Sequence, residues 1–311
     1  MNSAWATWWM LGVGIIVGAV LSIVFHRDPI AYAWKLTASN EYYTEPEAAE
    51  KGMFDETREA STTTAETTSG VPFVVGVATA SSSPRSLRVP VMIYHSVRPY
   101  QKGESKYQDA YDITPELLEE ELLYIKANGF HTVTFHAVAE YFANGTPLPG
   151  KPVILSFDDG WKNQYIYAFP LLKKYGMTGT FFIFSNPIDS HKPHWMSWAE
   201  VVELGRAGME IGGHSRTHPI LTKIVDDALL DKEISGSKKI IEGHLGHPML
   251  AFAYPFGAEN GETEQAVTRA GYTIARTVYS GVWNDPEHRL VFHGTLSSDN
   301  IRDFERLLAK Q

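Results

Sequence analysis

The chain of 311 residues contains no cysteine. Disulfide bonds and cysteine-ligated zinc are therefore excluded, and any bound metal must be held by His, Asp or Glu. Basic residues are also in deficit, with 27 Lys and Arg against 36 Asp and Glu and a formal net charge of -9. Because a nucleic-acid binder needs a basic surface for the phosphate backbone, this balance argues against nucleic acid as a partner.

Charged side chains are missing from the segment Asn2 to Phe25, which is rich in Val, Ile, Leu and Trp. As a helix rising about 1.5 Å per residue, it is long enough to cross a hydrocarbon core of about 30 Å. Trp5, Trp8 and Trp9 cluster near one end, as interfacial aromatic residues do. A cleavable signal peptide is the alternative, but it normally has a basic start and a shorter apolar core. We therefore predict an uncleaved membrane anchor over residues 1–26.

The orientation of this anchor is poorly specified by charge. Arg27 and Lys35 follow the segment, and no Lys or Arg precedes it. Positive-inside counting alone favours a cytoplasmic C-terminal side. The function argued below requires the opposite, so we predict a single-pass protein of the cell membrane with its catalytic domain outside the cytoplasm.

Large apolar residues are sparse again between about Glu41 and Ser83, where the sequence is first acidic and then rich in Ser and Thr. Such a stretch buries too little apolar surface to offset its ordering entropy, which predicts a flexible linker over residues 27–88. The apolar patch Val71 to Val77 leaves open a short strand in a small subdomain.

From Val89 onward, short apolar runs alternate with amphipathic segments, which is typical of repeated βα units. About seven units favour a distorted (β/α) barrel over residues 89–311, although periodicity does not exclude a doubly wound sheet. Thr114-Pro115-Glu116 and Ser197 to Glu200 predict helix starts. The expected strands are Val89–Tyr94, Val153–Phe157, Thr180–Phe184, Glu210–Gly213, Leu250–Tyr254, Thr273–Ala275 and Leu290–Phe292.

Polar residues gather where these expected strands end, and in a barrel those ends form the catalytic face. Asp158 and Asp159 stand in Ser-Phe-Asp-Asp-Gly, directly after the apolar residues Val153 to Leu155. Two adjacent carboxylates are costly unless a cation or a shared proton relieves them, so one could bind metal while the other acts as a base. A plain polar turn is the alternative, because Asp-Asp-Gly is also good turn chemistry.

His214 and His218 follow another strand in His-Ser-Arg-Thr-His. Imidazole is the commonest neutral metal ligand, although two exposed histidines would also explain the pair. Together with Asp159 they would make a three-ligand site with open positions for water and substrate, as a catalytic metal requires. A third cluster, Phe252 to Gly257 (FAYPFG), ends a further strand and by itself predicts only a turn.

In this order, SFDDG, HSRTH and FAYPFG resemble the T-F-D-D-G, H-S/T-x-x-H and R-x-P-Y-G motifs of polysaccharide deacetylases of carbohydrate esterase family 4, the NodB-homology group. The resemblance runs from about Val89 to Lys310 and implies a distorted (β/α) barrel. It implies that Asp159, His214 and His218 bind a divalent metal, usually Zn²⁺, and that Asp158 is the general base.

Further roles follow from the same resemblance. The backbone N–H of Phe256, in the Tyr position of the third motif, would stabilise the oxyanion, and Tyr254 and His95 are further candidates on the substrate side. His293 is the nearest candidate for the general acid, although a structural edge-strand histidine explains it equally well. Ala253 stands where the family often has an arginine that orients the base, which leaves the support of Asp158 open.

The resemblance implies a hydrolase that removes acetyl groups from N-acetylglucosamine units of a cell-wall or extracellular polysaccharide. Two other functions remain open. One is a membrane-tethered glycan-binding protein on an inactive deacetylase scaffold, for which Ala253 is the best support. The other is a metal-dependent amidase that acts on a non-sugar amide. The sequence does not distinguish peptidoglycan, poly-N-acetylglucosamine and chitin as substrates.

Overall fold

The computed structural model describes residues 86–100, 111–188, 190 and 192–309. The predicted membrane segment and nearly all of the predicted linker lie outside these residues. Among the helices that the structure describes, none is both long enough and apolar enough to cross a bilayer. The described residues belong to one compact unit, Ser83–Gln311.

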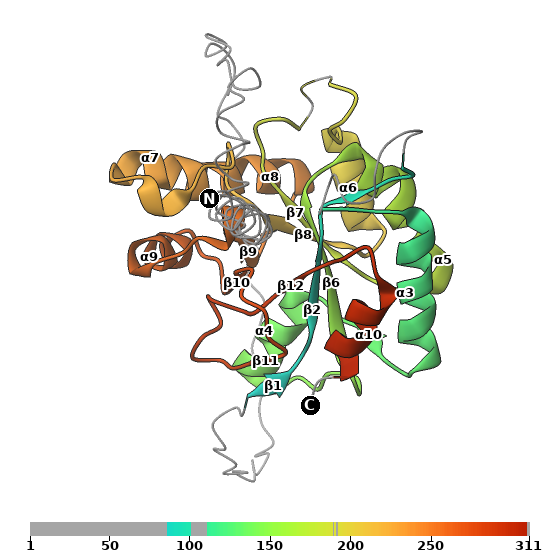
Figure 1. The fold of residues 1–311 in the computed structure, drawn as a ribbon. Helices are drawn as coiled ribbons and strands as arrows, with labels where there is room; N and C mark the ends of the chain where they lie inside the picture. Colours follow the sequence, from blue (N-terminus) through green and yellow to red (C-terminus); the bar gives the residue numbers. More distant parts are fainter. Residues whose placement is uncertain (1–85, 101–110, 189, 191, 310–311) are drawn as a thin grey trace, which may run out of the picture. The chain divides into compact units, whose positions relative to one another are not determined.

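A parallel eight-stranded sheet forms the centre of this unit (Figure 1). Val, Ile and Phe dominate the long strands, and this β-branched and aromatic composition suits a sheet that is covered on both faces. The strand order is β10 (Ile274–Arg276), β9 (Ala251–Ala253), β8 (Glu210–Gly213), β7 (Thr180–Ile183), β6 (Pro152–Asp159), β2 (Val91–Tyr94) and β12 (Thr295–Leu296), and β5 (His131–Thr132) also pairs with β6.

Two-stranded sheets lie beside it, β1 (Leu87–Arg88) with β11 (Trp283–Asn284) and β3 (Ser96–Val97) with β4 (Asp112–Ile113). The α-helices are α3 (Pro115–Ala127), α4 (Phe135–Asn144), α5 (Phe169–Tyr175), α6 (Trp198–Arg206), α7 (Asp227–Asp231), α8 (Ser237–Leu245), α9 (Gly261–Arg269) and α10 (Ile301–Ala309). Two π-helical segments, η2 (Gln164–Ala168) and η4 (Lys232–Gly236), and two 3₁₀ segments, η3 (Leu221–Lys223) and η5 (Pro255–Gly257), complete the described elements.

Helix starts follow the predicted capping signals. The Thr114 side chain accepts from the backbone N–H of Leu117, and Pro115 occupies the first helical position of α3. Ser197 and Glu200 form a reciprocal capping box at the start of α6. These side chains satisfy backbone donors that a helix start leaves unpaired, which is why short sequence signals located both helices.

The α/β architecture with parallel strands is confirmed, and the predicted distorted barrel takes the form of a curled half-barrel. Among the described residues, the edge strands β10 and β12 are not paired with each other. The segment from Phe292 to Leu296 connects the two edges of the sheet instead. Phe292 makes an isolated parallel bridge to Arg276, and Thr295 and Leu296 pair with β2. The strand predicted over Leu290–Phe292 is therefore wrong, because those residues make one bridge and the strand begins at Thr295.

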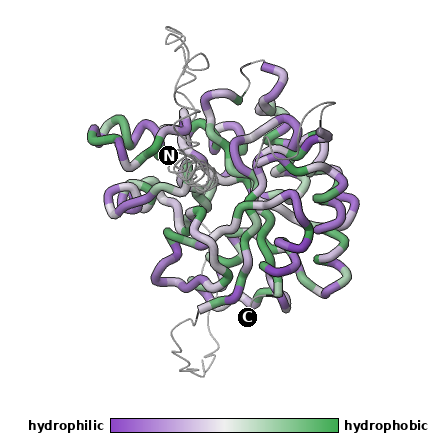
Figure 2. The backbone as a smooth tube through the Cα atoms, viewed as in Figure 1, coloured by the Kyte–Doolittle hydropathy of each residue, from purple (hydrophilic) through white to green (hydrophobic). Residues whose placement is uncertain are grey.

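Side chains alternate between two hydrophobic clusters on the two faces of the sheet. The inner cluster contains Ile154, Phe182, Ala253 and Ile274, with residues of α4 packed against them. The outer cluster contains their sequence neighbours on the same strands and the apolar faces of α3, α5, α6 and α8. Figure 2 shows the hydrophobic segments gathered in the central strands and the hydrophilic ones on the surrounding helices and loops. This alternation decides which polar residues share the inner face at the strand ends.

Candidate metal centre and catalytic site

Asp159 ends β6 and meets both predicted histidine ligands. Its Oδ1 lies 3.5 Å from Nε2 of His214 and 3.4 Å from Nε2 of His218. The two Nε2 atoms are 3.1 Å apart. One ligand atom from each residue lies within 4.8 Å of the others, so the structure brings the three predicted ligands together.

The electron-pair donors of this cluster fit a divalent cation. Nδ1 of His214 lies 2.7 Å from the carbonyl oxygen of Ala253. An Nδ1–H donated to that carbonyl leaves the Nε2 lone pair free, as in metal-ligating histidines. Asp159 Oδ1 is buried and has no hydrogen-bond donor. A cation between these atoms would satisfy all three lone pairs, and three protein ligands with space for water are typical of catalytic zinc.

Electrostatics keep the ligands in the protonation states that a metal needs. Burial by itself would raise the pKa of Asp159, but the neighbouring imidazoles of His214 and His218 hold it well below its ordinary value. Desolvation lowers the pKa of His218 to about 4, although its side chain is 18% exposed. Near neutral pH, Asp159 is therefore ionised and His218 neutral, which are the ligating forms.

Unusual backbone conformations place these residues. Among the described non-glycine residues, five have positive φ, and four of them lie here: Asp159 (78°), Ser215 (67°), His218 (62°) and Phe256 (59°). At Asp159 the left-handed conformation ends the regular alternation of β6, and Gly160 follows with φ 82°. Positive φ is uncommon for residues other than Gly, Asn and Asp, and residues with such strained backbone conformations cluster at functional sites.

Asp158, the predicted base, is 2% exposed and makes an ion pair with Arg276, whose side chain is fully buried. Nε of Arg276 also donates to Oγ of Ser156 at 3.1 Å. Burial by itself would raise the pKa of Asp158, but Arg276 and, less strongly, the neighbouring imidazoles lower it below its ordinary value. Arg276 therefore keeps the buried carboxylate ionised, with one oxygen fixed and the other available.

Arg276 is the functional residue that the sequence reasoning missed. It pairs in register with Ala253 on the neighbouring strand, so the guanidinium stands one strand away from the position where the family motif has its arginine. A signal was present in Thr-Ile-Ala-Arg, which places a cation at the end of an apolar strand. The predicted strand stopped at Ala275, one residue before the arginine. Because residues of a strand alternate between the two faces of the sheet, the sequence alone did not show that Arg276 faces Asp158.

His95 follows β2, as predicted, and joins the site. Its Nε2 lies 3.8 Å from Oδ2 of Asp158, and its side chain is 21% exposed. The amide of Gln164, from the π-helical segment η2, donates to the main-chain carbonyls of both His95 (2.6 Å) and Asp158. A buried side chain therefore ties together the ends of β2 and β6 on the base side of the site.

Trp161 orients the metal-side carboxylate. Its indole N–H donates to Oδ2 of Asp159 at 3.0 Å, which leaves Oδ1 for the histidine pair. The indole ring stacks on Trp195 with centroids 4.2 Å apart. Such hydrogen bonds to a ligating carboxylate fix its direction and are part of most metal centres.

The third predicted cluster contributes unequally. Phe256 lies beside the site, with its ring edge-on to His218 at 4.6 Å. The Tyr254 side chain is fully buried and packs edge-on against Phe252 in the outer cluster. A substrate role for the Tyr254 hydroxyl is therefore not supported by its placement, and the oxyanion role of the Phe256 N–H stays a prediction.

His293 does not lie at this site. Its main-chain N–H donates to Asn284 Oδ1, and its Nδ1 is 3.0 Å from the carbonyl oxygen of Trp283. Its ring also lies against Gly281, so the imidazole is directed toward residues 281–284. The structure thus favours the alternative of a structural histidine over the predicted general acid.

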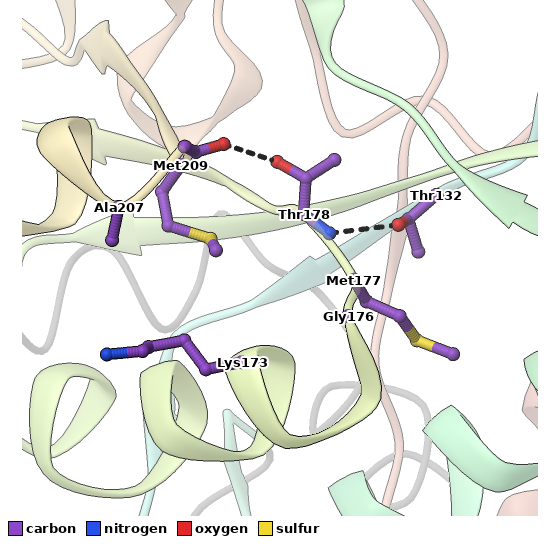
Figure 3. A pocket seen from close by; sticks show the side chains of 8 residues that line it. Thr132, Lys173, Gly176, Met177, Thr178, Ala207 and Met209 are labelled. Atoms are coloured by element: carbon purple, nitrogen blue, oxygen red, sulfur yellow. Dashed lines mark hydrogen bonds between the residues drawn. The ribbon is translucent and has the colours of Figure 1, made fainter.

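A cavity of about 430 Å³ opens at the opposite end of the strands (Figure 3). There the backbone N–H of Thr178 donates to Thr132 Oγ1, and the Thr178 hydroxyl donates to the carbonyl of Gly208, both at 2.9 Å. Among the described residues that line this cavity, Lys173 is the only ionisable one, so this lining lacks the clustered acids and imidazoles of a hydrolytic site.

Comparison with known proteins agrees with this geometry. A family model described as polysaccharide deacetylase matches residues 145–275. The Bacillus subtilis protein named "Putative polysaccharide deacetylase YxkH" is 26% identical over 206 residues. The match covers 66% of this chain and 70% of that protein. The poly-beta-1,6-N-acetyl-D-glucosamine N-deacetylase of Staphylococcus epidermidis is 26% identical over 185 residues, and the match covers 56% of this chain and 64% of that enzyme.

A solved structure shares the fold. The deacetylase PplD of Streptococcus pyogenes, in complex with acetate, superposes with a TM-score of 0.67 at 22% identity, covering 73% of this chain and 100% of that one. At this identity the likeness concerns the fold, and the curled parallel half-barrel is common to both.

Proposed function

We propose, on the premise that the chain belongs to the polysaccharide deacetylase family, that it hydrolyses the N-acetyl group of N-acetylglucosamine units in a cell-wall or extracellular polysaccharide. The observation that carries the proposal is one contiguous site at the ends of β6 and β8. The ionised carboxylate of Asp158 is held by the buried Arg276. Beside it lies the cluster of Asp159, His214 and His218, in which Oδ1 of Asp159 has no hydrogen-bond partner.

The roles of the two aspartates differ in this proposal. Asp159, His214 and His218 hold a divalent cation, for which Zn²⁺ suits the donor set. Such a cation supplies Lewis acidity, which lowers the pKa of water and polarises the acetamide carbonyl. Asp158 accepts a proton from the attacking water, and Arg276 holds the carboxylate in place for that transfer.

The remaining steps use residues around this pair. Water adds to the acetamide carbon, and the backbone N–H of Phe256 donates to the oxygen as negative charge develops there. The C–N bond then breaks, the sugar nitrogen takes a proton, and acetate leaves. His95 is the proposed proton donor, because its ring is the partly exposed imidazole nearest to Asp158 and is not one of the three ligands.

An exopolysaccharide is the preferred substrate in this proposal. Relatives from Escherichia coli and Staphylococcus are named as poly-beta-1,6-N-acetyl-D-glucosamine N-deacetylases, at 22% to 26% identity. The match covers only 33% of the Escherichia coli protein. Peptidoglycan and chitin contain the same acetamide, so they belong in the same assay.

We also propose that residues 1–26 anchor the protein in the cell membrane with the catalytic domain outside the cytoplasm. The uncharged run from Asn2 to Phe25 supports the anchor, and the location of such glycans supports the orientation. Fusing a reporter that is active only outside the cytoplasm to the C-terminus tests this topology, and an inactive but expressed fusion would contradict it.

The deciding experiment measures acetate release by the full chain from poly-β-1,6-N-acetylglucosamine, chitin oligomers and peptidoglycan. Release that stops with a chelator and returns with Zn²⁺ supports the proposal. Glycan binding without acetate release would favour the inactive scaffold, and hydrolysis of only non-sugar acetamides would favour the amidase. Arg276 weighs against the inactive scaffold, because it provides the support that Ala253 cannot.

A further inference from the structure

The loop between the two histidine ligands holds two strained residues. Ser215 and His218 both have left-handed backbone conformations, with φ of 67° and 62°. Such conformations are unfavourable for these residue types and persist only where the surrounding structure holds them. The imidazole of His218 depends on this conformation to reach Asp159, so the loop needs a support outside itself.

Glu233 provides three hydrogen bonds to the middle of the loop. Its Oε2 accepts from the backbone N–H of Arg216 at 3.0 Å and of Thr217 at 2.8 Å. Its Oε1 accepts from the Thr217 hydroxyl at 2.8 Å. Glu233 is 3% exposed, so these bonds are shielded from water. One carboxylate group therefore holds two consecutive backbone N–H groups and a side chain of the loop at once.

The element that carries Glu233 is itself unusual. Glu233 lies in the π-helical segment η4, between α7 and α8. Single π-helical turns are rare and recur at functional sites, because the extra residue changes the direction of a side chain. Ser237, at the start of α8, adds a hydrogen bond from its hydroxyl to the carbonyl of Ser215 at 2.6 Å. The loop is thus held from η4 and α8 at several consecutive residues.

We infer that Glu233 is a positioning residue of the metal centre, which holds the backbone of Arg216 and Thr217 so that His218 faces Asp159 and His214. It touches no ligand side chain in these contacts and acts only through the loop. The inference rests on the proposed metal-dependent function and adds to it a residue outside the three family motifs. A purely structural role would stabilise the fold without affecting metal affinity.

Glu210 offers a matched control within the same chain. Its carboxylate also accepts from two backbone N–H groups, of Phe135 and His136, both at 2.8 Å, and from the hydroxyl of Thr180 at 2.6 Å. It begins β8, whereas His214 follows the other end of that strand. The two glutamates therefore make the same three kinds of hydrogen bond at opposite ends of the half-barrel.

The test compares Glu233→Leu, Glu210→Leu and Glu233→Gln in the full chain. The dissociation constant for Zn²⁺ is measured by competition with a chromophoric chelator, and folding by circular dichroism and urea unfolding. We expect Glu233→Leu to raise the Kd for Zn²⁺ by about 10-fold or more, the usual cost of losing an outer-shell support. Glu210→Leu should lower the urea midpoint but change that Kd by less than about 3-fold, since it leaves the loop untouched.

Glu233→Gln tests rescue by a conservative change. Its carbonyl oxygen can accept from both N–H groups, and its amide can donate to the Thr217 hydroxyl, so its Kd should stay near the wild-type value. A folded Glu233→Leu variant with wild-type Kd, or an equal loss in Glu210→Leu, overturns the inference. If Glu233→Leu does not fold, Thr217→Val removes a single bond of the clamp, and an unchanged Kd in that variant also overturns it.

These readouts separate the inference from the proposed function, because no glycan is present. A wild-type chain that binds Zn²⁺ but releases no acetate contradicts the proposed function alone. A wild-type chain that binds no Zn²⁺ contradicts both.

Discussion

Asp158 and Asp159 are adjacent carboxylates on one strand, yet they are held by different parts of the molecule. The base side depends on the inner face of the sheet, where Arg276 reaches Asp158 from β10. The metal side depends on loops, with Trp161 bound to Oδ2 of Asp159 and with Glu233 bound to the loop before His218. Identical side chains therefore acquire separate roles from separate supports, and these supports can be changed one at a time.

The largest effect is expected on the metal side. Asp159→Ala, His214→Ala and His218→Ala should each lose bound metal and activity, because a three-ligand site without one ligand loses most of its affinity. Elemental analysis of the purified variants and acetate release check this. Full stoichiometric metal in any of the three would show that the ligand set is wrong.

On the base side, Asp158→Asn should lower kcat by about 100-fold or more, the usual range for a lost general base, and leave metal content near that of wild type. Asp159→Asn should instead weaken metal binding, and excess Zn²⁺ should partly restore its activity. Metal content and acetate release, measured for both variants across a range of Zn²⁺ concentrations, decide between the roles. If Asp158→Asn loses metal and Asp159→Asn keeps it, the two assignments are reversed.

A smaller loss is expected when the support of the base is removed. In Arg276→Met the buried Asp158 loses its cation, so its pKa rises above the present, lowered value. The base must be ionised to act, so the acidic limb of the pH profile of kcat should move to higher pH, with kcat near neutral pH lower by about 10-fold or more. Metal content should stay unchanged.

The register of β9 and β10 supplies the control for this change. Arg276 pairs with Ala253, and both side chains lie on the inner face. Ala253→Arg combined with Arg276→Ala should therefore recover part of the activity, since the guanidinium returns to the position that it has in the family motif. A pH profile of Arg276→Met that matches wild type would remove Arg276 from the site.

The smallest effect concerns stability behind the base side. Tyr94 stacks on Phe157, and its hydroxyl donates to Glu121 Oε2 at 2.8 Å. Burial raises the pKa of Glu121 from the ordinary 4.5 to about 8. Between these values the folded state holds a proton that the unfolded chain has released, so the free energy of unfolding falls as pH rises, by at most about 1.4 kcal/mol per pH unit.

Glu121→Gln removes this dependence and keeps an acceptor for Tyr94. From pH 5.5 to pH 7.5 its free energy of unfolding should rise relative to wild type by on the order of 2 kcal/mol, measured by urea unfolding. Glu116→Gln, which changes an exposed glutamate in the first turn of the same helix, should show no such change. If the free energy of unfolding changes with pH in the same way for Glu121→Gln and wild type, Glu121 is ionised in the folded state.

The sequence predicted the helix starts and the strand ends well, because both depend on local signals. A capping side chain and a proline act within one turn, and an apolar run followed by polar residues marks a strand end. Asp159, His214 and His218 were found for the same reason, since each follows such a run. How far the predicted distorted barrel closes could not be found in this way, because closure depends on how strongly the whole sheet curls and no local pattern records that.

Contacts between residues distant in the chain were decided only by the tertiary structure. Arg276 and Asp158 are 118 positions apart, and they meet because strand register puts both on the inner face of one curled sheet. Glu233 reaches the histidine loop from a π-helical turn, and the imidazole of His293 contacts the carbonyl of Trp283 instead of the site. The sequence by itself determined the chemistry at each strand end, whereas the packing of the sheet determined which of these residues act together.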